Sequence, residues 1–404
     1  MDKKKILLII AFLAVAGLLA FGLYYFFFRA APAPVVVTPT PGTPTGALPG
    51  AGTGVPGAPA VTPPTAGQPG ALAGAQAVAQ GGLTQSSMVA NVAALNTTLG
   101  ADGKTLQYWN SGDGKFYRVT ADGLIKPLSN EVFYNVNNVT WTPDKNKALL
   151  EYPDGAKIIY NFDTQKQFTI PKHWTDFSFS PQSDKLVSMS IGNDPDNRWL
   201  ITTNIDGTGT KAIEPLGENA DKVTVSWAPT NQIIAFSRTG ELLDVDQQEI
   251  IPVGQNHENF KSFTVEGMGF QPMWSPAGDK LLYSVYNADS GYRPTLWVAN
   301  ASSNQIGAKK QIQINTWADK CTIAGGDAYC AVPTNLDEGA GFDESIADGT
   351  PDVFYKVDLT TGIKTLLAVP QTEVTAKDLQ VSADGQYLFY ADKLNGQIYK
   401  IRLR

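Results

Sequence analysis

The sequence MWSPAGDK at residues 273–280 is the clearest indication of the fold, because it ends one apolar strand, makes a tight turn and starts another. Proline presets the backbone angle of the turn, serine and aspartate hydrogen-bond the turn backbone, and glycine adopts the left-handed conformation. The apolar residues Leu281, Leu282 and Tyr283 follow directly. The stretch therefore predicts a β-hairpin.

The same pattern recurs along the chain. Three further copies keep the proline, VTWTPD at 139–144, FSFSP at 177–181 and VSWAP at 225–229, and three weaker ones lose it, GADGK at 100–104, IAGGD at 323–327 and SADG at 382–385. The seven turns lie at positions 101, 143, 181, 229, 276, 324 and 383, with a mean spacing of 47 residues. A four-stranded propeller blade takes about 40 to 50 residues. The chain is therefore predicted to be all-β, with a seven-bladed propeller of four-stranded antiparallel blades over residues 83–404.

The aromatic-Ser-Pro hairpin followed by an apolar strand resembles the WD40-like PD40 repeat of TolB-type β-propellers. The resemblance covers residues from about 90 to the end of the chain. It implies a module outside the cytoplasm that docks to envelope proteins. Propellers host many unrelated functions, so the resemblance bears on the fold more than on the activity.

The last repeat supplies three strand patterns and then the chain stops one strand short. An open edge exposes unpaired backbone groups, so a fourth strand has to come from elsewhere. Residues 83–90, just before the first repeat, are the expected donor. This segment would join both ends of the domain in one blade.

Two cysteines flank the sixth hairpin. If Gly325 and Gly326 form its turn, Cys321 lies opposite Cys330 as a non-hydrogen-bonded pair, with Cα atoms about 4.5 Å apart. We predict a structural disulfide between them, with two buried free thiols as the alternative. A body outside the cytoplasm lies where disulfides persist.

The amino terminus has the pattern of a membrane anchor. Residues 6–28 hold no charge and are long enough to cross a bilayer, and Lys3, Lys4 and Lys5 precede them. The basic cluster places the amino terminus in the cytoplasm, so the predicted location is the plasma membrane, single-pass, with the propeller extracytoplasmic. A cleaved signal peptide is the alternative, but its apolar region would be shorter.

The segment at residues 30–82 is rich in proline and glycine, with alanine and threonine filling most of the rest. It has too little apolar surface to offset chain entropy. We expect a disordered linker that lifts the propeller off the membrane.

Composition excludes several functions. The chain has 31 basic and 38 acidic residues, a net charge of −7, so it lacks the basic surface that nucleic acid requires. Two cysteines and two histidines leave no zinc ribbon or histidine cage. No nucleophile elbow occurs either. We therefore predict no catalytic residues, no cofactor and a protein that is not an enzyme.

Insertions mark the candidate binding face. In a propeller, the connections between second and third strands and between blades lie opposite the repeated turns, and we assign most insertions to that face. The candidate binding residues are Asp194, Asp196, Arg198, His257, Tyr292, Arg293, Asp337, Glu338, Phe342, Asp343 and Glu344. The longest insertion, residues 333–352, also supplies the weak candidates for a calcium site, Asp337, Glu338, Asp343, Glu344, Asp348 and Asp352. No calcium-loop spacing occurs, which favours a solvated acidic loop.

These observations predict a membrane-tethered binding or scaffold module for an envelope or surface protein. The alternative is a surface enzyme or lectin that acts on glycans through carboxylates, with calcium as a candidate ion. Two facing carboxylates in a concave pocket would favour that alternative. The tryptophans at 141, 227 and 274 share a repeat position and are expected in blade cores, as are Trp297 and His173 in strand patterns.

Overall fold

The computed structural model describes residues 18, 21, 74–244, 246–258 and 260–404. The chain divides into two compact units, Met1–Gly67 and Gln68–Arg404. In the first unit the described residues are Leu18 and Phe21, both helical. The rest of the predicted anchor at 6–28, and the linker at 30–73, lie outside the described residues. Within the described residues, no helix has the length and apolar character needed to cross a membrane.

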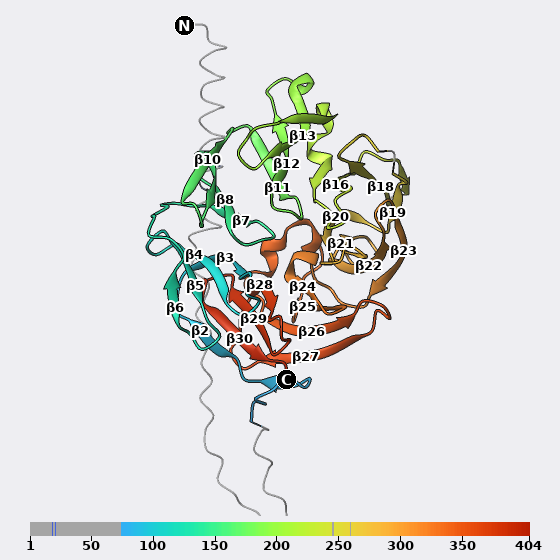
Figure 1. The fold of residues 1–404 in the computed structure, drawn as a ribbon. Helices are drawn as coiled ribbons and strands as arrows, with labels where there is room; N and C mark the ends of the chain where they lie inside the picture. The colour runs from blue at the N-terminus through green and yellow to red at the C-terminus, as the bar shows by residue number, and fades with distance from the viewer. Residues whose placement is uncertain (1–17, 19–20, 22–73, 245, 259) are drawn as a thin grey trace, which may run out of the picture. The chain divides into compact units, whose positions relative to one another are not determined.

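The second unit is a propeller of seven antiparallel sheets (Figure 1). The repeated hairpin supplies the first two strands of each blade. The strands of the first three blades are β3 (Ala94–Leu99), β4 (Leu106–Asn110), β5 (Lys115–Val119) and β6 (Ile125–Pro127); β7 (Asn138–Trp141), β8 (Lys147–Glu151), β9 (Lys157–Asn161) and β10 (Lys166–Ile170); and β11 (Trp174–Phe179), β12 (Lys185–Ile191), β13 (Arg198–Asn204) and β14 (Lys211–Pro215).

The fourth blade carries an extra hairpin. Its strands are β15 (Val223–Val225), β16 (Ile233–Ser237), β17 (Leu242–Asp244), β18 (Gln247–Gly254) and β19 (Phe263–Val265). The end of β18 pairs with β16, while its beginning pairs with both β17 and β19. The fifth blade is regular, with β20 (Met268–Trp274), β21 (Lys280–Tyr286), β22 (Thr295–Ala301) and β23 (Ile306–Ile312).

The last two blades complete the ring, and the start of the chain adds a strand to each. The sixth contains β24 (Cys321–Ala324), β25 (Asp327–Pro333), β26 (Asp352–Asp358) and β27 (Lys364–Pro370), and the seventh contains β28 (Ala376–Val381), β29 (Tyr387–Asp392) and β30 (Ile398–Arg402). Strand β2 (Ser87–Ala90) pairs antiparallel with β30, which confirms the predicted strand donor. Strand β1 (Leu83–Thr84) instead pairs parallel with β27 of the sixth blade.

The folded chain begins earlier than the expected start at residue 83. Ala79 is buried against the sixth and seventh blades, and its N–H donates to the carbonyl of Arg402 at 2.8 Å. The Gly81 N–H likewise donates to the carbonyl of Leu367 at 2.9 Å. The end of the Pro- and Gly-rich segment is therefore part of the closure.

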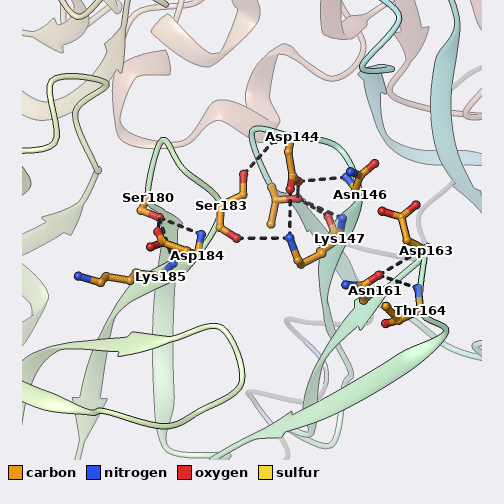
Figure 2. Close-up of polar contacts among 11 residues, drawn as sticks. Asp144, Asn146, Lys147, Asn161, Asp163, Thr164, Ser180, Ser183, Asp184 and Lys185 are labelled. Carbon is orange, nitrogen blue, oxygen red and sulfur yellow. Dashed lines mark hydrogen bonds and ion pairs between the residues drawn. The ribbon is translucent and has the colours of Figure 1, made fainter.

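The repeated turn is built as its sequence predicts, and Figure 2 shows two copies side by side. Ser180 donates to Asp184 at 2.7 Å and accepts the N–H of Lys185 at 3.0 Å. The Asp144 N–H in the second blade donates to the Ser183 hydroxyl of the third blade at 3.0 Å. The turns therefore close their own hairpins and also connect neighbouring blades.

A second device joins the inner strands of neighbouring blades. Three inner strands carry a bulge at an Asn or Asp with positive φ, a conformation these residues tolerate better than most. Each side chain accepts an N–H from the next blade: Asn96 from Val139 at 3.1 Å, Asp176 from Val225 at 3.0 Å and Asp378 from Thr97 at 2.8 Å. Desolvation raises the pKa of both Asp176 and Asp378.

The predicted disulfide is present. Cys321 pairs with Cys330 across the sixth hairpin, with Cα atoms 4.0 Å apart, and Ala324 faces Asp327 around the two turn glycines. The remaining short helices are η1 (Pro195–Asn197), η2 (Gly217–Lys222), η3 (Ala318–Lys320), η4 (Ala340–Phe342) and η5 (Glu344–Ala347).

Candidate functional site

The longest insertion, residues 333–352 of the sixth blade, folds against the fifth blade. The Gly339 N–H donates to the carbonyl of Gly291 at 2.9 Å, and the Gly341 N–H donates to the carbonyl of Tyr292 at 2.7 Å. In return, Nε of Arg293 donates to the carbonyl of Leu336 at 2.7 Å. Three hydrogen bonds thus fix the insertion to the connection between β21 and β22.

A small core lies under the insertion. Trp317, Leu336, Ala340 and Ala347 are buried against one another. Helix η3, which follows Trp317, contacts the inner strands β20 and β28, and Figure 1 shows turns of this region in orange near the centre of the ring. The insertion is therefore packed on its underside, unlike the solvated loop that the sequence favoured.

Its outer side presents apolar rings to solvent. Phe342 packs against Tyr286, with ring centroids 4.8 Å apart, and against Tyr292 at 5.2 Å. Phe342 nevertheless keeps 64% of its surface exposed, and Ile346 keeps 47%. At Gly341 a Cβ would lie 2.5 Å from the Cβ of Tyr286, so only glycine permits this packing. We call Tyr286, Tyr292, Phe342 and Ile346 the platform.

Ion pairs tie the insertion to the seventh blade. Nζ of Lys393, in the turn between β29 and β30, lies 2.6 Å from Asp348 and 3.3 Å from Glu344. Desolvation lowers the pKa of Lys393, but the carboxylates of Asp348 and Glu344 outweigh it and raise this pKa above its ordinary value. These pairs are partly exposed, so they fix geometry more than they stabilise the fold.

Glu344 also meets a second carboxyl. The Asp319 carboxyl, in η3, interacts with the carboxyl of Glu344. Desolvation, then the charge of Glu344 and a hydrogen bond with it, raise the pKa of Asp319 to about 7. Asp319 is exposed at the surface of η3. Two neighbouring carboxyls repel each other when both are ionised, which favours the protonated form of Asp319.

A buried ion pair lies at the end of the insertion. Nζ of Lys320 is 2.8 Å from Asp352, and their side chains are 6% and 0% exposed. The same Asp352 oxygen accepts the N–H of Ala376, at the start of β28, at 2.7 Å. Desolvation dominates and raises the pKa of Asp352, while the ammonium of Lys320 opposes it. The pair links η3, the insertion and the seventh blade.

The calcium candidates are therefore dispersed. Asp343 caps η5 by accepting the N–H of Ser345, Asp348 and Glu344 face Lys393, and Asp352 faces Lys320. In the described part of the chain, no three His, Cys, Asp or Glu side chains are placed to hold a metal ion.

The other candidate binding residues lie apart from the platform. In the third blade Asp194 caps η1 by accepting the N–H of Asp196, and Arg198 donates to backbone carbonyls of its own blade and of η2. Their polar groups hold the loop itself. Of the candidate face, the structure brings together Tyr292, Arg293 and the residues of the insertion.

His257 requires a correction. It lies in the connection between β18 and β19, the third and fourth strands of its blade, so this connection starts on the side of the repeated turns. Gln255, two residues earlier, donates to the carbonyl of Asn231 in such a turn at 2.6 Å. His257 itself reaches Glu214 of the third blade, with Nδ1 to Oε1 at 3.2 Å. The prediction assumed one side for every long connection, and this one crosses to a neighbouring blade.

The expected burial of His173 and of the tryptophans is confirmed for some of these residues and wrong for His173. His173 is exposed rather than packed in the core, because β11 begins only at the next residue. Trp227 is buried, and Trp141 and Trp274 are partly buried in blade cores, as expected. Trp297 packs on its blade but also lines a cleft, which its strand pattern did not indicate.

Comparison with known proteins gives the fold alone. No family model matches the chain, and no curated protein sequence matches it. An oligogalacturonate lyase in complex with manganese matches with a TM-score of 0.54 and 12% identity over 79% of this chain and 93% of that one. The Cps50 (Swd1) β-propeller domain of Myceliophteria thermophila matches with 0.54 and 10% identity over 79% and 100%. An oligogalacturonate lyase from Vibrio parahaemolyticus matches with 0.52 and 11% identity over 79% and 93%. At such identities the likeness supports a β-propeller and nothing about activity.

Proposed function

We propose that this chain is a non-catalytic docking module whose platform binds an envelope or surface protein. In this proposal residues 6–28 anchor it in the plasma membrane, and the propeller lies on the extracytoplasmic side. The observation that carries the proposal is the exposure of Phe342 and Ile346, at 64% and 47%, on an insertion fixed by backbone hydrogen bonds. The resemblance of the repeated turn to TolB-type propellers, which dock to envelope proteins, points the same way.

The platform has the composition of an interface centre. Aromatic rings held rigidly lose little entropy on binding, and such residues contribute most of the affinity in protein interfaces. Gly341 and the core beneath it hold Phe342 in place before any partner arrives. An isolated exposed leucine or isoleucine needs no explanation, but an exposed ring supported by two other rings is consistent with a binding role.

The charged residues around the platform, which form its rim, indicate the charge of the partner. Asp337, Glu338 and Asp343 are exposed around the platform, while Arg293 donates to a backbone carbonyl. The rim is therefore acidic. We expect a partner surface with an apolar pocket flanked by lysine or arginine, because complementary charges speed association and set the orientation.

A glycan-cleaving enzyme is the second candidate, and the carboxyl pair of Asp319 and Glu344 is the observation that raised it. Glycosidases hold their two carboxyl groups about 5 Å apart or more, with the sugar or a water between them. Here the carboxyls of Asp319 and Glu344 interact directly with each other. Such a contact differs from the spaced acid and base of a glycosidase, so we favour docking over glycan cleavage.

The proposal is tested by photocrosslinking in the source membranes with the full chain. A benzophenone amino acid replaces Phe342 in one variant and Leu124 in the control. Leu124 is 54% exposed and lies in the turn between β5 and β6 of the first blade. We expect one protein to crosslink from position 342 and not from 124, and purified partner to bind Phe342→Ala at least about tenfold more weakly. Identical crosslinks from both positions, or none from 342, would refute the platform.

A further inference from the structure

A polar cleft lies between the fourth and fifth blades, beside the platform. Its volume is about 790 Å³, within the range of small-ligand sites. The fourth blade contributes Glu266, which follows β19, and the fifth contributes Asp289, Trp297, Gln311 and Asn315. Neither the carboxyl pair nor the platform uses these side chains.

Trp297 forms one wall, and its ring is held in a fixed position. It lies on β22 between Tyr283 of β21 and Gln311 of β23, in one cross-strand row. Tyr283 stacks on the ring with centroids 6.3 Å apart and planes 10° apart. Nε1 donates to the hydroxyl of Thr295 at 3.2 Å. Because the indole N–H is already satisfied, the ring offers the cleft an apolar surface.

The opposite wall presents a fixed carboxylate. One oxygen of Glu266 is 2.7 Å from Nζ of Lys309, and the other accepts from the amide of Gln247 at 2.8 Å. These two donors hold the carboxylate at one orientation. A fixed acceptor of this kind binds hydroxyl groups without a large loss of entropy.

Further polar groups remain available to a ligand. Within the described chain, the side chains of Gln311 and Asp289 make no hydrogen bond and no ion pair. Asn315 uses its amide N–H on the carbonyl of Pro294 at 3.0 Å, which leaves its oxygen as an acceptor. The cleft thus combines one apolar ring with several amide and carboxylate groups.

We propose that this cleft binds a neutral oligosaccharide. A pyranose ring has an apolar C–H face, which stacks on an indole, and an edge of hydroxyls, which suit amides and carboxylates. The carboxylates of Glu266 and Asp289 repel acidic sugars, and the nearby Arg293 already donates to the carbonyls of Leu336 and Ser290. The proposal is independent of protein docking, because the residues that line the cleft do not include those of the platform.

The test measures binding of maltohexaose, cellohexaose and chitohexaose to the full chain in detergent by isothermal titration calorimetry. Trp297→Ala removes the stacking surface. Because Trp297 is partly buried, a second variant, Gln311→Ala, changes an exposed glutamine whose side chain makes no hydrogen bond to any described residue, and a third, Asn315→Ala, changes an exposed asparagine. Gln167→Ala is the matched control, since Gln167 is an exposed glutamine on β10, the outer strand of the second blade.

We expect saturable binding of at least one probe, weakened about tenfold or more by each cleft variant and unchanged by Gln167→Ala. Absence of heat for all three probes up to about 10 mM would overturn the proposal. So would binding that all the cleft variants retain at the parent affinity. If sugar binds but no protein crosslinks from position 342, the docking proposal is overturned and the sugar-binding proposal stands.

Discussion

The strand donor β2 provides the sharpest test of how this propeller is closed. Val89 is 7% exposed and packs in a cluster with Leu106, Phe389 and Ile398, whereas the adjacent Met88 is 50% exposed. These two neighbouring residues of one strand therefore differ sharply in burial. The pair Val89→Asp and Met88→Asp makes a matched experiment.

The cost of Val89→Asp follows from burial. Removing a buried valine side chain forfeits about 2 kcal/mol of transfer free energy. Holding a carboxylate, or its protonated form, without a partner in the same place costs about 2 kcal/mol more. The sum of about 4 kcal/mol lowers the folding equilibrium constant roughly a thousandfold. Met88→Asp changes a surface residue and should stay within about 0.5 kcal/mol.

The assay titrates each variant with guanidinium chloride and follows unfolding by tryptophan fluorescence. We expect a much lower midpoint for Val89→Asp, and loss of the single cooperative transition when residues 83–90 are deleted, because β30 then becomes an open edge. If Val89→Asp unfolds with the midpoint of Met88→Asp, β2 does not stabilise the ring. A deletion variant that melts like the parent would lead to the same conclusion.

Three further predictions concern the sixth blade and its neighbours. Replacing Cys321 and Cys330 by serine should lower the free energy of unfolding by about 2.5 kcal/mol, from the entropy of a loop with sequence separation 9, as measured by urea titration. Lys320→Met should cost about 3 to 5 kcal/mol because Asp352 is left as a buried, unpaired charge, and adding Asp352→Asn should recover part of that loss in a double-mutant cycle. Because the folded-state pKa of Asp319 is raised to about 7 from 3.8, the native state binds the extra proton between these values, so its contribution to stability should fall as pH rises from about 4 to 7. Melting temperatures of Asp319→Asn should lack this part of the pH dependence, and an unchanged profile would show that the carboxyl pair does not form.

Much of the frame was predictable because its signals are local. Each turn in the repeat encodes its own hairpin, since the serine, proline and aspartate act within a few residues of one another. The pairing of Cys321 with Cys330 and the donor strand within residues 83–90 followed from strand register and from the missing last strand. These inferences need only short-range geometry and the requirement that sheet edges be paired.

The failures have a different origin. His257 was grouped with the other insertions because strand counting assumes regular blades, whereas the loop after β18 starts at a repeated turn and reaches Glu214 of the third blade. The insertion looked like a solvated acidic loop because its composition is acidic. Its order comes from Gly341 fitting against Tyr286 and from a core that includes Trp317, a residue of a different connection.

The number of blades, the hairpin in each and the disulfide are readable from residue patterns, because a repeat specifies each unit through contacts between near neighbours. The contacts between units follow from the way the blades are arranged in the ring. The contact of Asp319 with Glu344, the platform around Phe342 and the cleft at Trp297 each join residues from different blades or connections. Ring closure sets those distances, and no pattern along a single chain encodes them.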